Sequence, residues 1–454
     1  MPNLPWFILI FLCSHIPMLF LGFGLDPDAW RIANTAFDLR HHLVYHASRF
    51  PGYPVPEFLN TVVIDFGYHA TNSLTMLLSL LSALAFGRIL READNEEKGL
   101  LVLTYAFLPL VWINSTNTMD YMWSLSFIIL TWLFIIKERY VVAGLLLAMA
   151  AGSRAASAAF VIPFFYLLHS RGSARAPIVR FLLTFFATSV FIYMPLLVTY
   201  GLSFIHRYPS HTGILQIGYQ ALKYYGLPSI ILLTIILLAV ARNLNKVSVK
   251  LDKVGIFSLL SITTILVTFF LAPYQIEYLI PLVPFGLMLT QHLGRRSLFI
   301  LLCCALMLHS FVNIGSIEHT GDGRITIQTL DAGAVIKNFA ARRKQLAYAR
   351  MLAKVELPKN SVAIVGTWLP IVAYLDERIS SSAKAKQMFD SNLPRAGLWN
   401  FAKNIHYRYL IDRDELRQLQ QSGHLIFYTE GIRAFTRDIY GYDINEYGAI
   451  LLDI

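Results

Sequence analysis

The chain is poor in charged residues and in cysteine. Only 15% of its 454 residues are charged, 56% are hydrophobic, and the mean hydropathy is +0.53. Because about a quarter of the residues of a soluble protein are charged, this composition indicates an integral membrane protein. The 3 cysteines, Cys13, Cys303 and Cys304, lie in apolar stretches, which excludes a disulfide framework and a cysteine metal site. We interpret them as small buried hydrophobic residues.

The sequence also lacks the pattern of a nucleic-acid-binding protein. Its net charge of +10 comes from 38 lysines and arginines against 28 acids. No basic tract with interleaved aromatic residues occurs outside the apolar stretches, so we exclude nucleic acid as a partner. The positive charge is concentrated instead in short loops between those stretches.

About eleven apolar stretches approach the ~20 residues that a helix needs to cross a bilayer. We predict a polytopic α-helical membrane protein with spans at 6–24, 70–88, 99–114, 120–136, 140–152, 155–168, 181–200, 228–241, 255–272, 277–292 and 297–314. The first stretch is too long, and has too little positive charge before it, to be a cleaved signal peptide. We therefore expect it to be retained as a helix.

The distribution of positive charge predicts the orientation of these spans. With a cytoplasmic N-terminus, the inner loops hold more bases than the outer loops, among them Arg88, Lys137, Arg171, Arg242 and Arg295. The loop 25–69 and the C-terminal part then lie outside the cytoplasm. Two short spans meet at Arg154, which predicts broken helices buried in protein. The compact inner loops favour a prokaryotic plasma (inner) membrane.

The composition changes to that of a soluble domain at about Ile317, so we divide the chain into 1–316 and 317–454. In the second part, the pattern predicts a helix, a turn and the apolar strand Val362–Val365, followed by a strand, a helix, a strand and a helix. Asp412 is the expected N-cap of the first of these last two helices. This alternation predicts a small α/β domain. It has no phosphate loop, HExxH motif or nucleophile elbow, so we assign it a structural or acceptor-guiding role.

Acidic residues at the ends of predicted helices are the candidate catalytic groups. Asp26 is placed to cap a helix, and Asp28 in its first turn complements the helix dipole. An aspartate at the membrane surface is also placed to take the proton of an acceptor hydroxyl. Asp120 starts a later helix at the same predicted membrane face, where a charge is costly and usually functional. The three acids leave open a divalent metal, although no His/Cys cluster supports one.

The helix that follows Asp26 carries an apolar stripe. Trp30, Ala33 and Phe37 are spaced to share one face of the predicted helix Ala29–Leu43. Such a helix can lie along the outer membrane interface. Trp30 is then a candidate lining residue of the site.

Two arginines are candidate phosphate ligands. Arg49 precedes a Pro/Gly-rich turn that contains Tyr53, and a guanidinium there can bind phosphate in bidentate geometry. Arg154 has no acid within several residues, and an unpaired arginine at membrane depth suggests an anionic ligand. The alternative for Arg154 is snorkelling toward the outer head groups. Weaker candidates for the lining of the same cavity are His206, Arg207 and His211 in the loop 201–227, and Glu277 and Tyr278 in the turn before a proline-bearing span.

Taken in order, these motifs over residues 1–290 resemble the GT-C class of membrane glycosyltransferases. The nearest likeness is to the branch of protein O-mannosyltransferases and aminoarabinose transferases. The matching segments are Asp26 followed by Trp30, Arg49 before PGYP, Asp120 in TMDYMWSL, Arg154 in AAGSRAASAAFVIP, and YLIPLVP. Two departures occur: Glu57 stands where related sequences carry a lysine, and Arg154 replaces a lysine.

The resemblance implies an inverting transfer from a polyprenyl-phosphate sugar to a lipid, glycan or protein acceptor outside the cytoplasm. It implies that Asp26 accepts the acceptor's proton, and that Arg49 and Arg154 stabilise the departing lipid phosphate. Asp120 then orients the site or holds a metal, and no other cofactor is implied. The alternatives are a transporter or flippase of a lipid-linked glycan precursor, which the lack of an internal repeat disfavours, and a non-catalytic scaffold.

Overall fold

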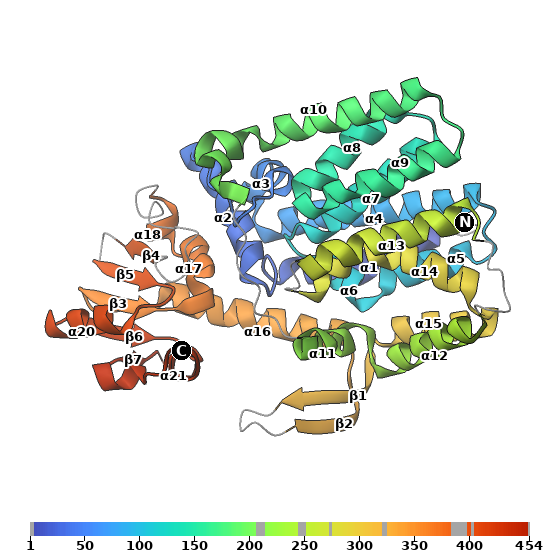
Figure 1. Ribbon diagram of the computed structural model, residues 1–454. Coiled ribbons are helices and arrows are strands. Elements are labelled where there is room, and N and C mark those ends of the chain that lie inside the picture. The colour runs from blue at the N-terminus through green and yellow to red at the C-terminus, as the bar shows by residue number, and fades with distance from the viewer. Residues whose placement is uncertain are drawn as a thin grey trace. The chain divides into compact units, whose positions relative to one another are not determined.

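Helices predominate in the computed structural model (Figure 1). It describes residues 4–205, 214–243, 251–271, 275–319, 325–382, 397–400 and 404–452. The chain forms two compact units, which we term the helical unit (Met1–Phe20, Pro51–Pro56 and His69–Ala340) and the sheet unit (Leu21–Phe50, Glu57–Tyr68 and Ala341–Ile454). Most of the predicted outer loop 25–69 thus belongs to the same unit as the C-terminal sheet.

The helical unit is built of helices with one β-hairpin. Its elements are α1 (Leu4–His15), η1 (Ile16–Phe20), α4 (Tyr68–Glu92), α5 (Lys98–Phe107), α6 (Pro109–Asn114), α7 (Tyr121–Ile136), α8 (Tyr140–Ser153), η3 (Ala155–Phe160), α9 (Val161–Ser170), α10 (Arg175–Tyr200), η4 (Gly201–Ile205), α11 (Ile214–Tyr225), α12 (Leu227–Asn243), α13 (Lys253–Leu271), η5 (Ile276–Leu279), α14 (Leu282–Leu293), α15 (Arg296–Leu308), β1 (Val312–His319) and β2 (Ile325–Ala332).

Close packing of α8 fixes the centre of this unit. Helix α8 lies between α7 and α10 (Figure 1). Gly144 of α8 makes the close approach to α10 possible, since a Cβ there would stand 2.5 Å from the Phe181 carbonyl oxygen. A side chain at this position would force the two helices apart.

Within the residues that the structure describes, three helices are long and apolar enough to cross a membrane: Tyr68–Glu92, Arg175–Ser203 and Lys253–Leu271. The pair Gln216–Tyr225 and Leu227–Arg242, bent by 102°, makes a fourth if it is counted as one span. On the face of α10, Phe191 and Val198 are each 77% exposed, which is compatible with contact to lipid.

The prediction of about eleven spans is not confirmed. Among the described residues, the other apolar helices are only 10–17 residues long, shorter than the ~20 that a crossing needs. The apolar runs continue, but the helices break within them. The run 99–114 is interrupted before Pro109, which begins α6, and hydropathy alone does not register this break. The break at the extended residue Arg154 lies between the spans predicted at 140–152 and 155–168 and was expected from their shortness.

The sheet unit contains the small α/β layer that the sequence predicts. Its five strands run in the order β4 (Gly397–Asn400), β5 (Ile405–Arg408), β3 (Ser361–Ile364), β6 (Leu425–Tyr428) and β7 (Ile450–Leu451). Strand β3 pairs in parallel with β5 and β6, β6 pairs in parallel with β7, and β4 is antiparallel to β5. The helical elements of this unit are α2 (Pro27–His42), α3 (Pro54–Thr61, from Glu57 on), η2 (Ile64–Phe66), α16 (Ala334–Lys354, from Ala341 on), η6 (Gly366–Trp368), α17 (Leu369–Leu375), α18 (Glu377–Ser380), α20 (Arg413–Gln421), α21 (Ile432–Tyr440) and η8 (Ile444–Tyr447).

Alternation along β3 produces a core on each face of the sheet. Val362 and Ile364 belong to one buried cluster with Leu416 of α20, whereas Ala363 and Val365 belong to the other, with side chains of α17. The Asp412 carboxylate caps α20 as predicted and accepts the Glu415 N–H at 2.8 Å.

Helix α2 packs on α17 within this unit, which corrects the predicted role of its apolar stripe. Trp30 and Ala33 are fully buried, and Phe37 lies 5.8 Å from the ring of Tyr374 in α17. The indole N–H of Trp30 donates to the Gly24 carbonyl at 3.1 Å. The stripe therefore faces protein and not the membrane interface, and Trp30 is a core residue. Helical spacing identifies an apolar face but not the material that covers it.

Arg342 of α16 ties down the segment that leads into α2. Its guanidinium is fully buried and donates to the carbonyl oxygens of Gly22 at 2.9 Å and Leu21 at 3.3 Å. Gln345, one turn later, donates to the Leu25 carbonyl at 2.8 Å. Burial lowers the pKa of Arg342 to about 9, so this side chain remains protonated at neutral pH.

Replacing Arg342 with alanine is expected to lower the free energy of unfolding by about 3 kcal/mol, because two backbone carbonyls lose a charged donor and a void remains. The same substitution should increase the hydrogen exchange of the peptide 21–34, measured by mass spectrometry. Arg343→Ala is the matched control, since its neighbouring side chain on the same helix is exposed. Equal exchange in the two variants would contradict this role of Arg342.

Candidate functional site

The first group of predicted site residues lies at the start of α2. Asp26 is the N-cap, and its Oδ1 accepts the Asp28 N–H at 2.9 Å. Pro27 occupies the first helical position, where its missing N–H costs nothing. The capping role expected from the sequence is therefore present, and the hydrogen bond orients the Asp26 carboxylate.

Asp28 joins two arginines in what we term the loop cluster (Asp26, Asp28, Arg31 and Arg49). Its Oδ1 lies 3.2 Å from Nη1 of Arg31, and its Oδ2 lies 3.0 Å from Nε of Arg49. The exposed fractions of these side chains are 21% for Asp28, 14% for Arg31 and 12% for Arg49. Partial burial strengthens such pairs relative to a surface salt bridge. The cluster carries two guanidinium groups and two carboxylates.

The sequence did not lead us to predict two residues that lie at the loop cluster, Arg31 and Tyr409. Arg31 pairs with Asp28 one helical turn away. This spacing is visible in the sequence and is typical of an ion pair on a helix. Tyr409, which follows β5, is partly buried near the same groups: burial raises the pKa of its hydroxyl, and Arg31 counteracts this shift electrostatically. No local pattern links Tyr409 to residues nearly 400 positions earlier in the chain, so only the fold reveals it.

Glu57 anchors the loop before the Pro/Gly-rich turn. Its side chain is fully buried. Oε1 accepts the N–H and the hydroxyl of Ser48 at 2.8 and 2.6 Å, and Oε2 accepts the hydroxyl of Tyr45 at 2.8 Å. Burial raises the pKa of the Glu57 carboxyl above its usual value near 4.5, although the hydrogen bonds and Arg49 oppose the shift. Glu57 therefore holds Ser48 next to Arg49.

Substitutions at Glu57 should separate what its hydrogen bonds contribute to the free energy of unfolding from what its charge contributes. Glu57→Ala is expected to cost about 2–3 kcal/mol of unfolding free energy, because buried donors lose their acceptor.

A raised pKa of the Glu57 carboxyl means that the folded state binds the proton more tightly than the unfolded chain does. The resulting stabilisation is complete below pH 4.5 and is lost as the pH rises through the folded-state pKa. Glu57→Gln should remove this component from the pH dependence of unfolding, and an unchanged profile would contradict the assignment.

The second group, in the helical unit, centres on Asp120 and Arg154. Asp120 immediately precedes α7, and Arg154 is the extended residue between α8 and η3. Nη1 of Arg154 donates to Oδ2 of Asp120 at 2.5 Å, and both residues are buried, with 0% of Asp120 and 9% of Arg154 exposed. Arg154 is thus paired, in contrast to the unpaired arginine that the sequence suggested. The broken helix predicted at this position is present.

Aromatic rings enclose the Arg154 guanidinium. Its Cζ lies 4.6 Å from the ring centre of Tyr121 and 4.2 Å from that of Tyr278. Tyr53, which is 6% exposed, also interacts with it electrostatically. Cation–π contacts with these two rings restrict the orientation of the guanidinium. Tyr53 and Tyr278, both predicted as lining residues, therefore belong to this group, which we term the buried pair and its rings.

Glu277, another predicted lining residue, bonds to a residue outside these two groups. The Glu277 carboxylate accepts the Tyr224 hydroxyl at 2.7 Å and so joins η5 to α11. His206, Arg207 and His211 lie outside the described residues. Over the part of the chain that the structure describes, no group of three or more His, Cys, Asp or Glu side chains is arranged to hold a metal ion.

Comparison with known proteins gives no family assignment. No protein-family model, curated protein or solved structure matches this chain. The function therefore has to be argued from the two groups of residues themselves.

Proposed function

We propose that the protein is an inverting glycosyltransferase that moves a sugar from a polyprenyl-phosphate donor to an acceptor outside the cytoplasm. The observation that carries the proposal is the buried pair of Asp120 and Arg154 at a break between helices. Removing two charges from water is expensive, and such pairs in apolar helical surroundings are usually retained for function. A cation held in a restricted orientation is suited to a phosphate whose charge grows as the sugar leaves.

The loop cluster supports the other half of the reaction. Asp26 is the proposed proton acceptor for the attacking hydroxyl, and its hydrogen bond from the Asp28 N–H sets the direction of its carboxylate. Arg49 is the proposed additional phosphate ligand, held in place through Asp28 and through Glu57 at Ser48. Asp120 positions Arg154 in this scheme and takes no proton.

The chemistry in this proposal balances without a further reactant. The acceptor oxygen forms a bond to the anomeric carbon while the bond from that carbon to the phosphate oxygen breaks. The electron pair leaves with the polyprenyl phosphate, and the acceptor proton goes to Asp26. Attack opposite to the leaving group inverts the configuration of the anomeric carbon.

Release of polyprenyl phosphate is the direct test. The purified chain in lipid nanodiscs is incubated with a panel of polyprenyl-phosphate sugars, together with membrane lipid, glycan and peptide acceptors. We expect release that depends on one donor and on one acceptor class. Binding of donor with movement across the bilayer, but without release, would favour the alternative of a flippase, for which the broken helix at Arg154 is equally suited. Failure to bind any donor would overturn both.

A further inference from the structure

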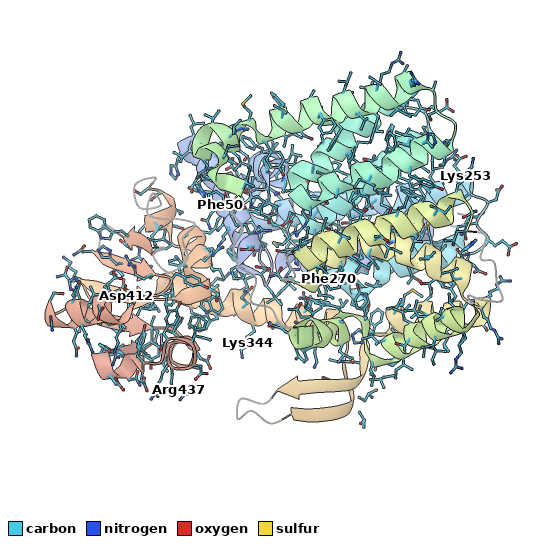
Figure 2. All side chains as sticks on the ribbon, in the orientation of Figure 1. Phe50, Lys253, Phe270, Lys344, Asp412 and Arg437 are labelled. Atoms are coloured by element: carbon cyan, nitrogen blue, oxygen red, sulfur yellow. The ribbon has the colours of Figure 1, made fainter. Side chains whose placement is uncertain are left out.

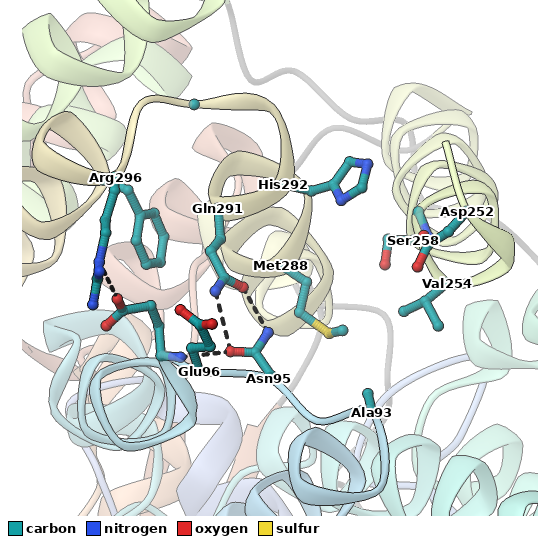
Figure 3. A pocket seen from close by; sticks show the side chains of 14 residues that line it. Ala93, Asn95, Glu96, Asp252, Val254, Ser258, Met288, Gln291, His292 and Arg296 are labelled. Atoms are coloured by element: carbon teal, nitrogen blue, oxygen red, sulfur yellow. Dashed lines mark hydrogen bonds and ion pairs between the residues drawn. The ribbon is translucent and has the colours of Figure 1, made fainter. Parts of the chain in front are cut away.

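A cavity of about 390 Å³ lies in the helical unit, away from the buried pair. It is formed where the ends of α4 and α14 meet the beginnings of α5, α13 and α15 (Figure 3). Helix α13 begins at this cavity and runs for 19 residues, which is about 28 Å. The ring of Tyr278 that covers Arg154 belongs to η5, which follows the far end of α13. The cavity is therefore a separate place in the fold.

Apolar and polar side chains line the cavity in similar measure, and a pair of amides holds one side of it. Val254 and Met288 are among the apolar groups. Asn95 and Gln291 donate to each other's carbonyl oxygens at 2.7 and 3.1 Å, which joins the end of α4 to α14 (Figure 3). Apolar groups beside fixed polar groups suit a small amphiphilic ligand.

Two carboxylates at this cavity have no ion-pair partner among the described residues. Glu97 is paired with Arg296 at 2.6 Å, but Glu96 and Asp252 form no ion pair with any residue in the described ranges. These two acids stand on opposite sides of the cavity (Figure 3). Asp252 is fixed in position because its Oδ1 accepts the Gly255 N–H at 2.7 Å. The cavity thus presents negative charge to whatever enters it.

A buried hydroxyl also lines the cavity. Ser258 is 1% exposed, and its Oγ has no hydrogen-bond partner within the part of the chain that the structure describes. Buried polar groups in folded proteins are nearly always hydrogen-bonded, so an exception that lines a cavity indicates a missing partner. This observation is independent of the two acids.

We propose that the cavity binds a small amphiphilic primary ammonium compound. Its N–H groups donate to the carboxylates of Glu96 and Asp252, in hydrogen bonds strengthened by charge. Its polar part satisfies the Ser258 hydroxyl, and its apolar body packs on Val254 and Met288. Two sources share this chemistry: a free amine, and the ethanolamine head group of a membrane lipid.

The test uses the full chain and two probes. In detergent, binding of 2-phenylethylammonium is measured by calorimetry, with neutral 2-phenylethanol for comparison. In nanodiscs, the unfolding temperature is compared between phosphatidylethanolamine and phosphatidylcholine. Saturable binding of the amine identifies a free ligand, whereas a higher unfolding temperature in phosphatidylethanolamine alone identifies the lipid head group. Absence of both effects, or equal binding of the alcohol, overturns the proposal.

Three variants and one control test whether the probe binds in this cavity. Glu96→Gln and Asp252→Asn should each weaken the responding probe about tenfold or more, whereas Glu92→Gln, an exposed acid nearby on α4 that pairs with Arg88, should not. Ser258→Ala should weaken binding while the unfolding temperature of the unliganded chain is unchanged, because the hydroxyl has no hydrogen-bond partner to lose in the described part of the chain. An effect of equal size in Glu92→Gln would mean that the probe responds only to surface charge.

Discussion

Asparagine in place of Asp26 is expected to lower the release of polyprenyl phosphate by about 10²–10⁴-fold, the usual loss when a general base is removed. The amide has no basic oxygen that can take the acceptor's proton. Asparagine is as good an N-cap as aspartate, so the hydrogen bond to the Asp28 N–H is retained. The loss should appear in the rate of turnover, with donor binding and unfolding temperature unchanged.

The matched control for this variant is Asp412→Asn. Asp412 is likewise an N-cap, with its Oδ1 bonded to the Glu415 N–H, and it has no role in the proposed reaction. Its turnover should equal that of the unchanged chain. Full activity in Asp26→Asn would remove Asp26 from the mechanism. Equal losses in the two variants would show that a weakened cap, and not a missing base, lowers the rate.

Alanine in place of Asp120 is expected to destabilise the helical unit by about 3–5 kcal/mol, because it leaves the Arg154 charge buried without its partner. The rings of Tyr121 and Tyr278 beside the guanidinium do not replace a carboxylate. The unfolding midpoint in detergent and the fraction of protein that remains monodisperse on heating both measure this effect. Glu92→Ala is the control, since its pair with Arg88 is exposed and should contribute less than about 1 kcal/mol.

The double variant Asp120→Ala, Arg154→Met separates charge from packing. If the uncompensated charge is the cause, removing Arg154 should restore much of the stability that Asp120→Ala loses, since apolar replacements of buried pairs are often tolerated. A double variant as unstable as the single one would instead assign the cost to the lost side-chain volume. In either case the double variant should release no polyprenyl phosphate under the proposed mechanism.

Features set by short stretches of sequence were predicted well. The Asp26 and Asp412 caps depend on the two or three residues that follow each aspartate, and both are present. The strand predicted at Val362–Val365 corresponds to β3, because a run of apolar residues after a turn is a strong local signal. The break at Arg154 also followed from the short apolar segments on either side.

Features set by partners far along the chain were not predicted. Arg154 lies 34 residues from Asp120, so it was interpreted as unpaired. Trp30 has the spacing of a lipid-facing residue, but α17 covers it from more than 300 positions away. The number of spans is not confirmed for a related reason: continuous apolar composition does not reveal where the backbone leaves the helix. Apolar residues are favoured both where a helix packs against protein and where it faces lipid, so the apolar pattern alone does not distinguish the two.

The covering of α2 by α17 sets an order of events during synthesis. Helix α2 leaves the ribosome early, yet Asn34 donates to the carbonyl of Pro370, a residue made 336 positions later, at 2.7 Å. Until that residue emerges, the apolar stripe of α2 lacks the cover that α17 provides, although Phe23 can already contact Trp30. The nascent chain must therefore hold a hydrophobic helix in a non-native environment for most of its translation, at the membrane surface or on a chaperone. Any truncation that removes α17 leaves the same surface uncovered permanently.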